Sequence, residues 1–118
     1  MTEKTVHRVL AAFNDGNAAA FGGLFTEDGV MIEYPDKVAG TGPAEVSAHL
    51  ERFFIAFPNA RVALRARIDL GARQVTHEHF DRGDGSPAYD AVLVYTISEA
   101  GIVRMDFVRA ISPEAAHV

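Results

Sequence analysis

The hydrophobic repeat of the chain changes once, near Asn59, and this change constrains the fold more than any other feature of the sequence. Before Asn59, apolar residues recur at spacings of three and four, which is typical of amphipathic helices. After it, they alternate with polar residues at a spacing of two, which is typical of strands with one buried face. The sequence therefore predicts an α+β domain in which helices precede a run of antiparallel strands.

Three helices are predicted in the first half of the chain. The first begins near Thr2, and its apolar face consists of Val6, Val9, Leu10 and Phe13. The second is short and capped by Asn17. Gly22 and Gly23 weaken it by about 1 kcal/mol each relative to Ala, or else allow it to approach another element closely. The third extends from Gly42 and Pro43 to Pro58, and its apolar stripe consists of Val46, Leu50, Phe53, Phe54 and Phe57.

Five strands are predicted, over residues 29–34, 62–70, 74–82, 89–97 and 102–110, and residues 36–41 are predicted to be a loop. The buried face of the 62–70 strand is predicted to consist of Val62, Leu64, Ala66, Ile68 and Leu70. Short glycine-containing segments separate the last four strands, as hairpin turns do. These elements indicate three helices packed on a curved, mixed but mostly antiparallel sheet.

Composition limits the organisation of the chain and its possible partners. Its 118 residues suit one domain, over 1–118. Eleven basic and sixteen acidic residues give a net charge of −5, which argues against nucleic acid or an anionic membrane and favours small neutral or cationic partners. The absence of cysteine excludes disulfides and thiolate chemistry. No apolar run has the length of a signal peptide or a membrane span, so a cytoplasmic location is expected.

Two phrases carry a family resemblance, AAFNDGNAAAFGGLFTEDGVMIEYP and GTGPAEVSAHLERFF. With the order of the elements, they resemble the nuclear transport factor two-like superfamily over essentially the whole chain. This superfamily includes ketosteroid isomerases, SnoaL-like polyketide cyclases and limonene epoxide hydrolases. The resemblance implies a cone-shaped α+β barrel with a pocket between sheet and helices, and a homodimer through the outer sheet face. It identifies a fold much better than a reaction.

The ketosteroid isomerase chemistry does not map onto this sequence. Alignment places Val9 at the oxyanion-binding Tyr, Tyr34 at the catalytic Asp, and a position near Leu93 at the protonated Asp. Glu33 would be a displaced base, but a shift of one residue along a strand turns the side chain to the other face.

The limonene epoxide hydrolases match better at the phrase HEHFDR. Asp81 matches the Asp of their Arg-x-Asp pair, and His79 replaces the Arg. Asp106, in RMDFVR, aligns with their second Asp, and Arg104 would supply the missing cation from the neighbouring strand. Glu33 falls near their water-holding Asn. The resemblance therefore implies a carboxylate pair in the pocket.

Strand pleat connects these residues. Residues 75, 77, 79 and 81 share one face of a strand. If that face and Asp106 both point into the pocket, the carboxylates of Asp81 and Asp106 share a space of low dielectric constant. Their proton affinities then separate, so that one acts as a base and the other as an acid. His79 would then shuttle a proton or orient Asp81. The hypothesis is a hydrolase or isomerase without cofactor or metal, acting on a small apolar molecule. The predicted catalytic residues are Asp106, Asp81, His79 and Arg104, and the predicted substrate-binding residues are Glu33, Tyr34, Phe54 and His77.

Several alternatives remain open from the sequence. The phrases THEH and DRGDG could lie at a solvated strand end, and Asp106 could form a structural salt bridge with Arg104 or Arg109. The pattern His77-x-His79-x-Asp81 also suits zinc or iron, although no further ligand is fixed. His49 is expected to be exposed or at an interface. The whole chain could instead be a noncatalytic ligand-binding or dimerisation module.

Overall fold

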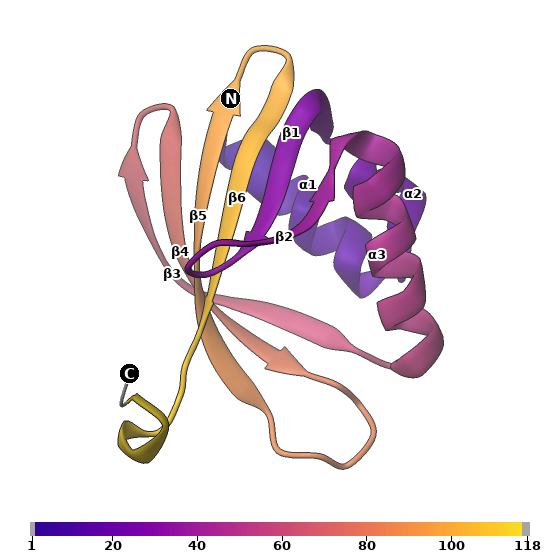
Figure 1. Ribbon diagram of the computed structural model, residues 1–118, viewed down its shortest axis with the longest axis vertical. Coiled ribbons are helices and arrows are strands. Elements are labelled where there is room, and N and C mark those ends of the chain that lie inside the picture. The colour runs from indigo at the N-terminus through magenta and orange to yellow at the C-terminus, as the bar shows by residue number, and fades with distance from the viewer. Residues whose placement is uncertain (1, 117–118) are drawn as a thin grey trace.

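The computed structural model describes residues 2–116, in which three helices and one curved sheet enclose a common interior (Figure 1). The helices are α1 (Thr2–Asn14), α2 (Ala18–Gly22) and α3 (Gly42–Ala56). The strands are β1 (Phe25–Glu33), β2 (Lys37–Thr41), β3 (Arg61–Leu70), β4 (Arg73–Asp81), β5 (Tyr89–Ser98) and β6 (Gly101–Arg109), followed by a 3-10 turn, Pro113–Ala116. No helix in this range is long and apolar enough to cross a membrane.

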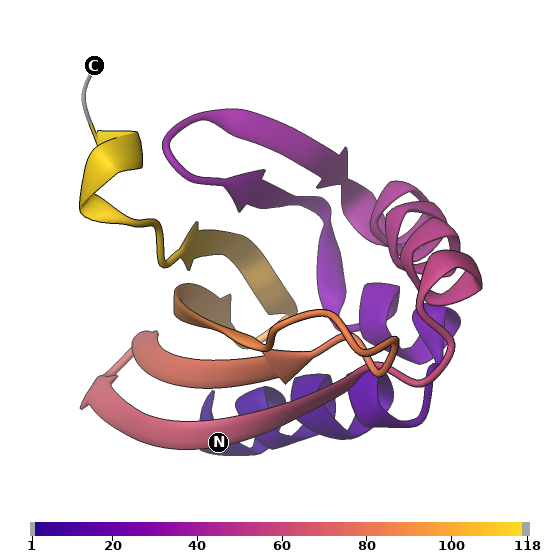
Figure 2. The ribbon, with the colours of Figure 1, turned by 90° about the horizontal axis from the view of Figure 1, so that it is seen from below.

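The six strands form one mixed sheet in the order β2-β1-β6-β5-β4-β3. β1 and β6 are parallel, and every other neighbouring pair is antiparallel. β2 and β3 are the two edges, so the sheet curves without closing. The helices lie together on one side of it, α1 against β3 and β4, and α3 against β1 and β2 (Figures 1 and 2). The α+β cone predicted from the sequence is confirmed.

Most predicted elements are present, and the one predicted loop within the first half of the chain contains a strand. Asn17 caps α2 as predicted, because its Oδ1 accepts a hydrogen bond from the backbone nitrogen of Ala20 at 3.0 Å. The segment predicted as a loop contains β2, which pairs with β1 as an edge strand. Only Gly40 is buried in β2, so the strand has no apolar alternation to reveal it. Backbone pairing alone defines it.

A bulge reverses the side chains of β3. The β3–β4 register shifts between Leu64 and Ala66, and beyond the shift Ile68 and Leu70 are 59% and 60% exposed. An extra residue in one strand turns every later side chain to the opposite face. The prediction that Ala66, Ile68 and Leu70 are buried is therefore wrong, whereas Val62, which precedes the bulge, is buried as predicted.

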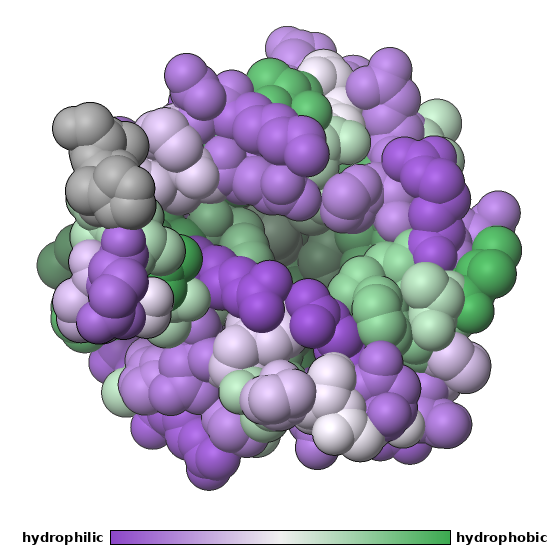
Figure 3. Space-filling model, turned by 60° about the horizontal axis from the view of Figure 1, so that its bottom comes forward, coloured by the Kyte–Doolittle hydropathy of each residue, from purple (hydrophilic) through white to green (hydrophobic). Residues whose placement is uncertain are grey.

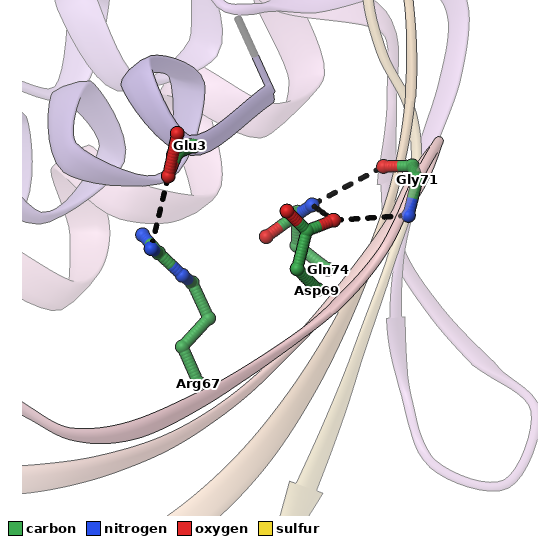
Figure 4. Close-up of polar contacts among 5 residues, drawn as sticks. All are labelled: Glu3, Arg67, Asp69, Gly71 and Gln74. Carbon is green, nitrogen blue, oxygen red and sulfur yellow. Dashed lines mark hydrogen bonds and ion pairs between the residues drawn. The ribbon is translucent and has the colours of Figure 1, made fainter.

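The side chains that the bulge turns toward α1 are polar, and they take part in two separate sets of polar contacts (Figure 4). Arg67 Nη2 lies 3.0 Å from Glu3 Oε2 and ties β3 to the first turn of α1. Asp69 Oδ1 accepts hydrogen bonds from the Gly71 backbone nitrogen at 3.0 Å and from Gln74 Nε2 at 2.8 Å. These bonds stabilise the β3–β4 turn. The bulge therefore replaces apolar packing at this end of the sheet with polar contacts.

Gly22 allows α2 to pack closely against α3. A Cβ atom added there would lie 2.5 Å from the carbonyl oxygen of Pro43 and 2.9 Å from the backbone nitrogen of Ser47, and it would also collide with the Ser47 hydroxyl. Of the two roles that the sequence allows for this glycine, the structure supports close approach.

We expect Gly22→Ala to lower the free energy of unfolding by about 1–3 kcal/mol, because the cost of overpacking exceeds the gain in helix propensity. Urea unfolding followed by circular dichroism measures the change. Gly23→Ala is the matched control, since Gly23 has a right-handed backbone with φ of −62° and no contact from α3. Unchanged or increased stability of Gly22→Ala would contradict this packing.

Candidate active site

A cavity of about 450 Å³ lies between the inner face of the sheet and helices α1 and α3. This volume is within the range of small-molecule sites, about 300–1,000 Å³. Its wall is mainly apolar, and three of its seven Phe and Tyr side chains come from the helices, namely Phe13, Phe21 and Phe53, while Phe57 directly follows α3. Figure 3 shows the opening, with hydrophobic side chains in its depth and hydrophilic ones at its rim. The predicted pocket between sheet and helices is therefore present.

The inner face of β4 consists of its even-numbered side chains. Gln74, Thr76, Glu78 and Phe80 are buried, and Glu78 and Phe80 line the cavity. The odd-numbered side chains lie on the outer face of the sheet, so the predicted orientation of this strand is wrong. Each set of alternate residues mixes polar and apolar types, and the pattern therefore predicts a strand without deciding which set is inside.

His77, His79 and Asp81 are consequently outside the cavity. His77 Nε2 and His79 Nδ1 lie 3.1 and 2.7 Å from the two carboxylate oxygens of Asp90, on the adjacent strand β5. The hydrogen bonds from His79 and His77 lower the pKa of Asp90. Asp81 instead accepts a hydrogen bond from the Gly83 backbone nitrogen at 2.8 Å. The two histidines therefore pair with a carboxylate other than the one predicted.

Asp106 and Arg104 also lie on the outer face, where they bind each other. Arg104 Nε and Nη2 donate to the two Asp106 oxygens at 2.9 and 3.0 Å. This hydrogen-bonded pairing raises the pKa of the guanidinium. The structure thus contains the salt bridge that the sequence left open as an alternative, and the predicted orientation of Asp106 toward the cavity is wrong.

Of the four predicted substrate-binding residues, Glu33 lines the cavity and Tyr34, Phe54 and His77 do not. Glu33 lines the cavity and lies 3.5 Å from Lys37 Nζ, whereas Tyr34 is 64% exposed and outside the lining. Phe54 packs on Phe13 with ring centroids 5.3 Å apart and borders a separate, shallow depression. Phe53, its neighbour on α3, and Phe57, directly after the helix, reach the cavity instead. His77, as described above, is on the outer face.

Glu78 is the cavity carboxyl that sequence reasoning missed. Its side chain is 1% exposed, and Oε2 accepts hydrogen bonds from Thr76 Oγ1 at 2.6 Å and Tyr95 Oη at 2.7 Å. Within residues 2–116, Oε1 has no hydrogen-bond partner. One oxygen is therefore fixed by two hydroxyl groups, and the other is available to a molecule in the cavity. The signal in the sequence was the alternation Thr76, Glu78, Phe80, in which an acid stands between β-forming residues.

Burial raises the pKa of the Glu78 carboxyl above its ordinary value of 4.5, and the hydrogen bonds from Thr76 and Tyr95 offset this only in part. Desolvation has this effect because a charge loses more hydration than a neutral acid does. Tyr95 is fully buried, and burial followed by the Glu78 charge holds its pKa well above 10.0. Tyr95 therefore remains a hydrogen-bond donor, and Glu78 is the group that exchanges protons.

His49 is a second titratable group in the cavity wall, contrary to the exposed or interface position expected for it. It is half-buried on α3, and this burial lowers its pKa below 6.5, against a smaller opposing effect of Glu33. A neutral imidazole therefore faces the cavity at pH 7.

Neither the His77-x-His79-x-Asp81 pattern nor any other group of three His, Asp or Glu side chains in the described part of the chain could hold a metal ion. The metal hypothesis therefore has no site in this range. The largely apolar wall of the cavity includes the buried acid Glu78 and the half-buried imidazole of His49, together with Glu33 and three arginines. This combination suits proton transfer on an apolar molecule.

The comparisons with known proteins agree with this architecture. A family model described as a SnoaL-like domain matches residues 6–105. No curated protein matches the chain. An uncharacterized cystatin-fold protein from Novosphingobium aromaticivorans superposes with a TM-score of 0.81 at 25% identity, covering 90% of this chain and 96% of that one.

Two further solved structures share the fold. A hypothetical protein with a ketosteroid isomerase-like fold from Catenulispora acidiphila, in complex with trimethylamine, gives a TM-score of 0.80 at 19% identity, with coverages of 92% and 87%. A putative polyketide cyclase from Sinorhizobium meliloti gives 0.74 at 15% identity, with coverages of 88% and 93%. The superfamily predicted from the sequence is confirmed.

The raised pKa of Glu78 predicts how stability depends on pH. The folded state holds the proton of the Glu78 carboxyl more tightly than the unfolded state does. The contribution of this proton to the free energy of unfolding is therefore complete below about pH 4.5, and it is lost as the pH rises through the pKa of Glu78 in the folded state. The difference in unfolding free energy between wild type and Glu78→Gln should therefore shift in favour of the variant as pH rises from 4.5 to 8. Urea unfolding at several pH values measures it. Glu99→Gln, at an exposed turn, is the control, and equal pH dependence of wild type and Glu78→Gln would refute the shift.

Proposed function

We propose that this chain, which belongs to the family of SnoaL-like domains, is a cofactor-free enzyme that moves a proton on a small apolar substrate, with Glu78 as its acid–base group. The observation that carries the proposal is the carboxyl at the cavity wall, 1% exposed and with one oxygen unpaired among residues 2–116. Burying a carboxyl costs free energy, and such groups concentrate at functional sites.

The surroundings of Glu78 suit it to this role. Thr76 and Tyr95 hold Oε2 and thereby fix the plane of the carboxylate, so that Oε1 is presented to the substrate. Its raised pKa brings it closer to neutrality, where one group is effective first as a base and then as an acid. Glu78 would take a proton from carbon next to a carbonyl and return it to a different atom. The net reaction is an isomerisation or a ring closure, with no oxidant or reductant consumed.

His49 offers a second contact to the substrate from the opposite, helical wall. Its neutral imidazole carries one N–H group, which can donate a hydrogen bond to the carbonyl oxygen as negative charge develops there. Glu78 on the sheet and His49 on α3 would then act on the two ends of an enolising group.

Proton transfer explains this cavity better than epoxide hydrolysis does. The epoxide hydrolase comparison required Asp81 and Asp106 in the pocket, and both lie on the outer face of the sheet. The putative polyketide cyclase among the structural neighbours supports an isomerase or cyclase, although at 15% identity it supports the fold first.

A noncatalytic ligand-binding module is the second candidate. The observation in its favour is the aromatic wall, in which Phe13 contacts Phe53 and Phe80 at centroid distances of 5.7 and 5.6 Å. Such a wall binds an apolar molecule without any chemistry. The two candidates differ in whether Glu78 is required for turnover or only borders the ligand.

We also propose that two copies pair through the outer sheet face. Val92 is 40% exposed there, and it lies among the half-buried valines of β4, β5 and β6, which are Val75, Val94 and Val108. The ionic groups beside them, Asp90 and Asp106, are already paired within the chain. At the centre of this face a second copy would therefore meet these valines beside carboxylates that are already paired, as a self-complementary interface requires.

Glu78→Gln should abolish proton exchange in the cavity while preserving the fold, because the amide fills the same space but cannot carry the proton. The measurement is deuterium incorporation next to the carbonyl of 2-tetralone in D2O, followed by NMR, with a loss of at least about 100-fold expected. Glu99→Gln is the control for the removed charge. Retained exchange in Glu78→Gln, with loss in Asp106→Asn, would contradict the assignment to Glu78. Binding of 2-tetralone without any exchange would favour the noncatalytic module.

Val92→Lys should weaken self-association by at least about tenfold, because a charge at the centre of an apolar contact must be desolvated. Sedimentation velocity over a range of concentrations measures the dissociation constant. Ile55→Lys is the matched control, since Ile55 is 77% exposed on α3, away from the sheet. A wild type that stays monomeric at all concentrations, or a dimer unaffected by Val92→Lys, would refute the outer-face interface.

A further inference from the structure

We infer that the cavity binds an apolar molecule bearing one anionic group, a carboxylate or a comparable acidic oxygen group, which Arg82 and Arg109 hold at the opening. The inference rests on the proposed function in one respect only, that a small molecule occupies the cavity. It adds the class of that molecule.

Three adjacent strands bring the two arginines together. Arg82 follows β4, Arg109 ends β6, and Tyr89 begins the strand between them, β5. Tyr89 pairs with Phe80, and Arg109 pairs with Ala91, so these residues meet at one end of the sheet. Arg82, Tyr89 and Arg109 all line the cavity.

Aromatic rings hold both guanidinium groups. Arg82 Cζ lies 4.9 Å from the ring centroid of Tyr89 and 5.2 Å from that of Phe57, and Arg109 Cζ lies 4.1 Å from the Tyr89 ring. A guanidinium that contacts a ring with its face keeps its N–H groups free at its edge. The two cations are therefore held near one point without using the donors that would bind an anion.

Neither Arg82 nor Arg109 has a carboxylate of residues 2–116 at ion-pair distance, although Arg67 and Arg104 do. The pKa of Asp84 is lowered first by hydrogen bonds from Ser86 and least by the charge of Arg82. Arg82 Nε is buried and has no hydrogen-bond partner. A buried donor without a partner is rare in folded proteins and costs free energy. An acceptor brought by the ligand would satisfy it.

The charge of the cavity opposes that of the chain. The chain carries −5, whereas the lining contains three arginines, including Arg52, and two glutamates, Glu33 and Glu78. Charges beyond about 10 Å are largely screened at 0.1 M salt, so the local excess of arginine decides which ligand enters. The preference for neutral or cationic partners, expected from net charge, therefore does not apply to this site.

The dimensions of the cavity also limit the size of the molecule that carries the anionic group. A cavity of about 450 Å³ admits a small molecule and excludes a polymer. Arg82 lies four positions after Glu78, directly beyond the end of β4, which corresponds to about 13 Å of extended backbone. The anionic group and the reacting carbon would thus lie at opposite ends of a molecule of one or two rings. Planar carboxylates suit paired N–H donors better than a point charge does.

The test compares two ligands that differ only in charge, 2-naphthylacetate and 2-naphthylacetamide, by isothermal titration calorimetry. Wild type should bind the acid at least about tenfold more tightly than the amide, and added salt should reduce this preference. In the double variant Arg82→Met/Arg109→Met the acid should lose at least about tenfold in affinity while the amide keeps its own. Arg73→Met, which removes a charge at the other end of β4, is the control and should change neither.

Amide binding reports whether each variant retains the cavity. Equal affinity of wild type for acid and amide, or a parallel loss of both in the double variant, would overturn the inference and show that the arginines only pack against the rings. Equal affinity would leave the proposed function standing, since proton exchange on the neutral ketone is measured separately. Failure of wild type to bind either ligand would overturn it as well.

Discussion

The hydroxyl groups of Thr76 and Tyr95 bound to Glu78 are the contacts on which the arrangement of the site depends. They place an acid on the concave face of the sheet, where water is largely excluded, and they satisfy one of its oxygens at 2.6 and 2.7 Å. A buried acid without such donors would be strongly destabilising. With them, Glu78 is held in one orientation and keeps a proton more firmly than an exposed glutamate does.

The space in front of Glu78 exists because the sheet curves and the helices stay at its rim. The bulge in β3 turns Arg67 and Asp69 toward α1, and Arg67 binds Glu3 in the first turn of that helix. Close packing of α2 on α3 at Gly22 holds the helical layer together. The interior between these two regions is lined by aromatic rings and remains open at one end (Figure 3).

Charged side chains are paired differently on the outer face of the sheet and at the cavity opening. On the outer face Arg104 pairs with Asp106, whereas at the cavity opening Arg82 and Arg109 form no ion pair with any residue in 2–116. The same residue type therefore has a structural role on one face and an available charge on the other. Net charge averages over both faces and therefore does not describe the charge at the cavity opening.

The sequence by itself determined the kinds of elements and their order, because a repeat of 3.6 or 2 residues follows from local backbone geometry. It therefore predicted the helices and the four strands of the meander, and the family resemblance added the cone with its pocket. The tertiary structure decided which alternate residues of β4 face inward, where the bulge in β3 falls, and that residues 37–41 pair as a strand. His79 and Glu78 are neighbours, yet only Glu78 lies in the cavity. That choice depends on which face the helices cover, a contact between segments far apart in the chain.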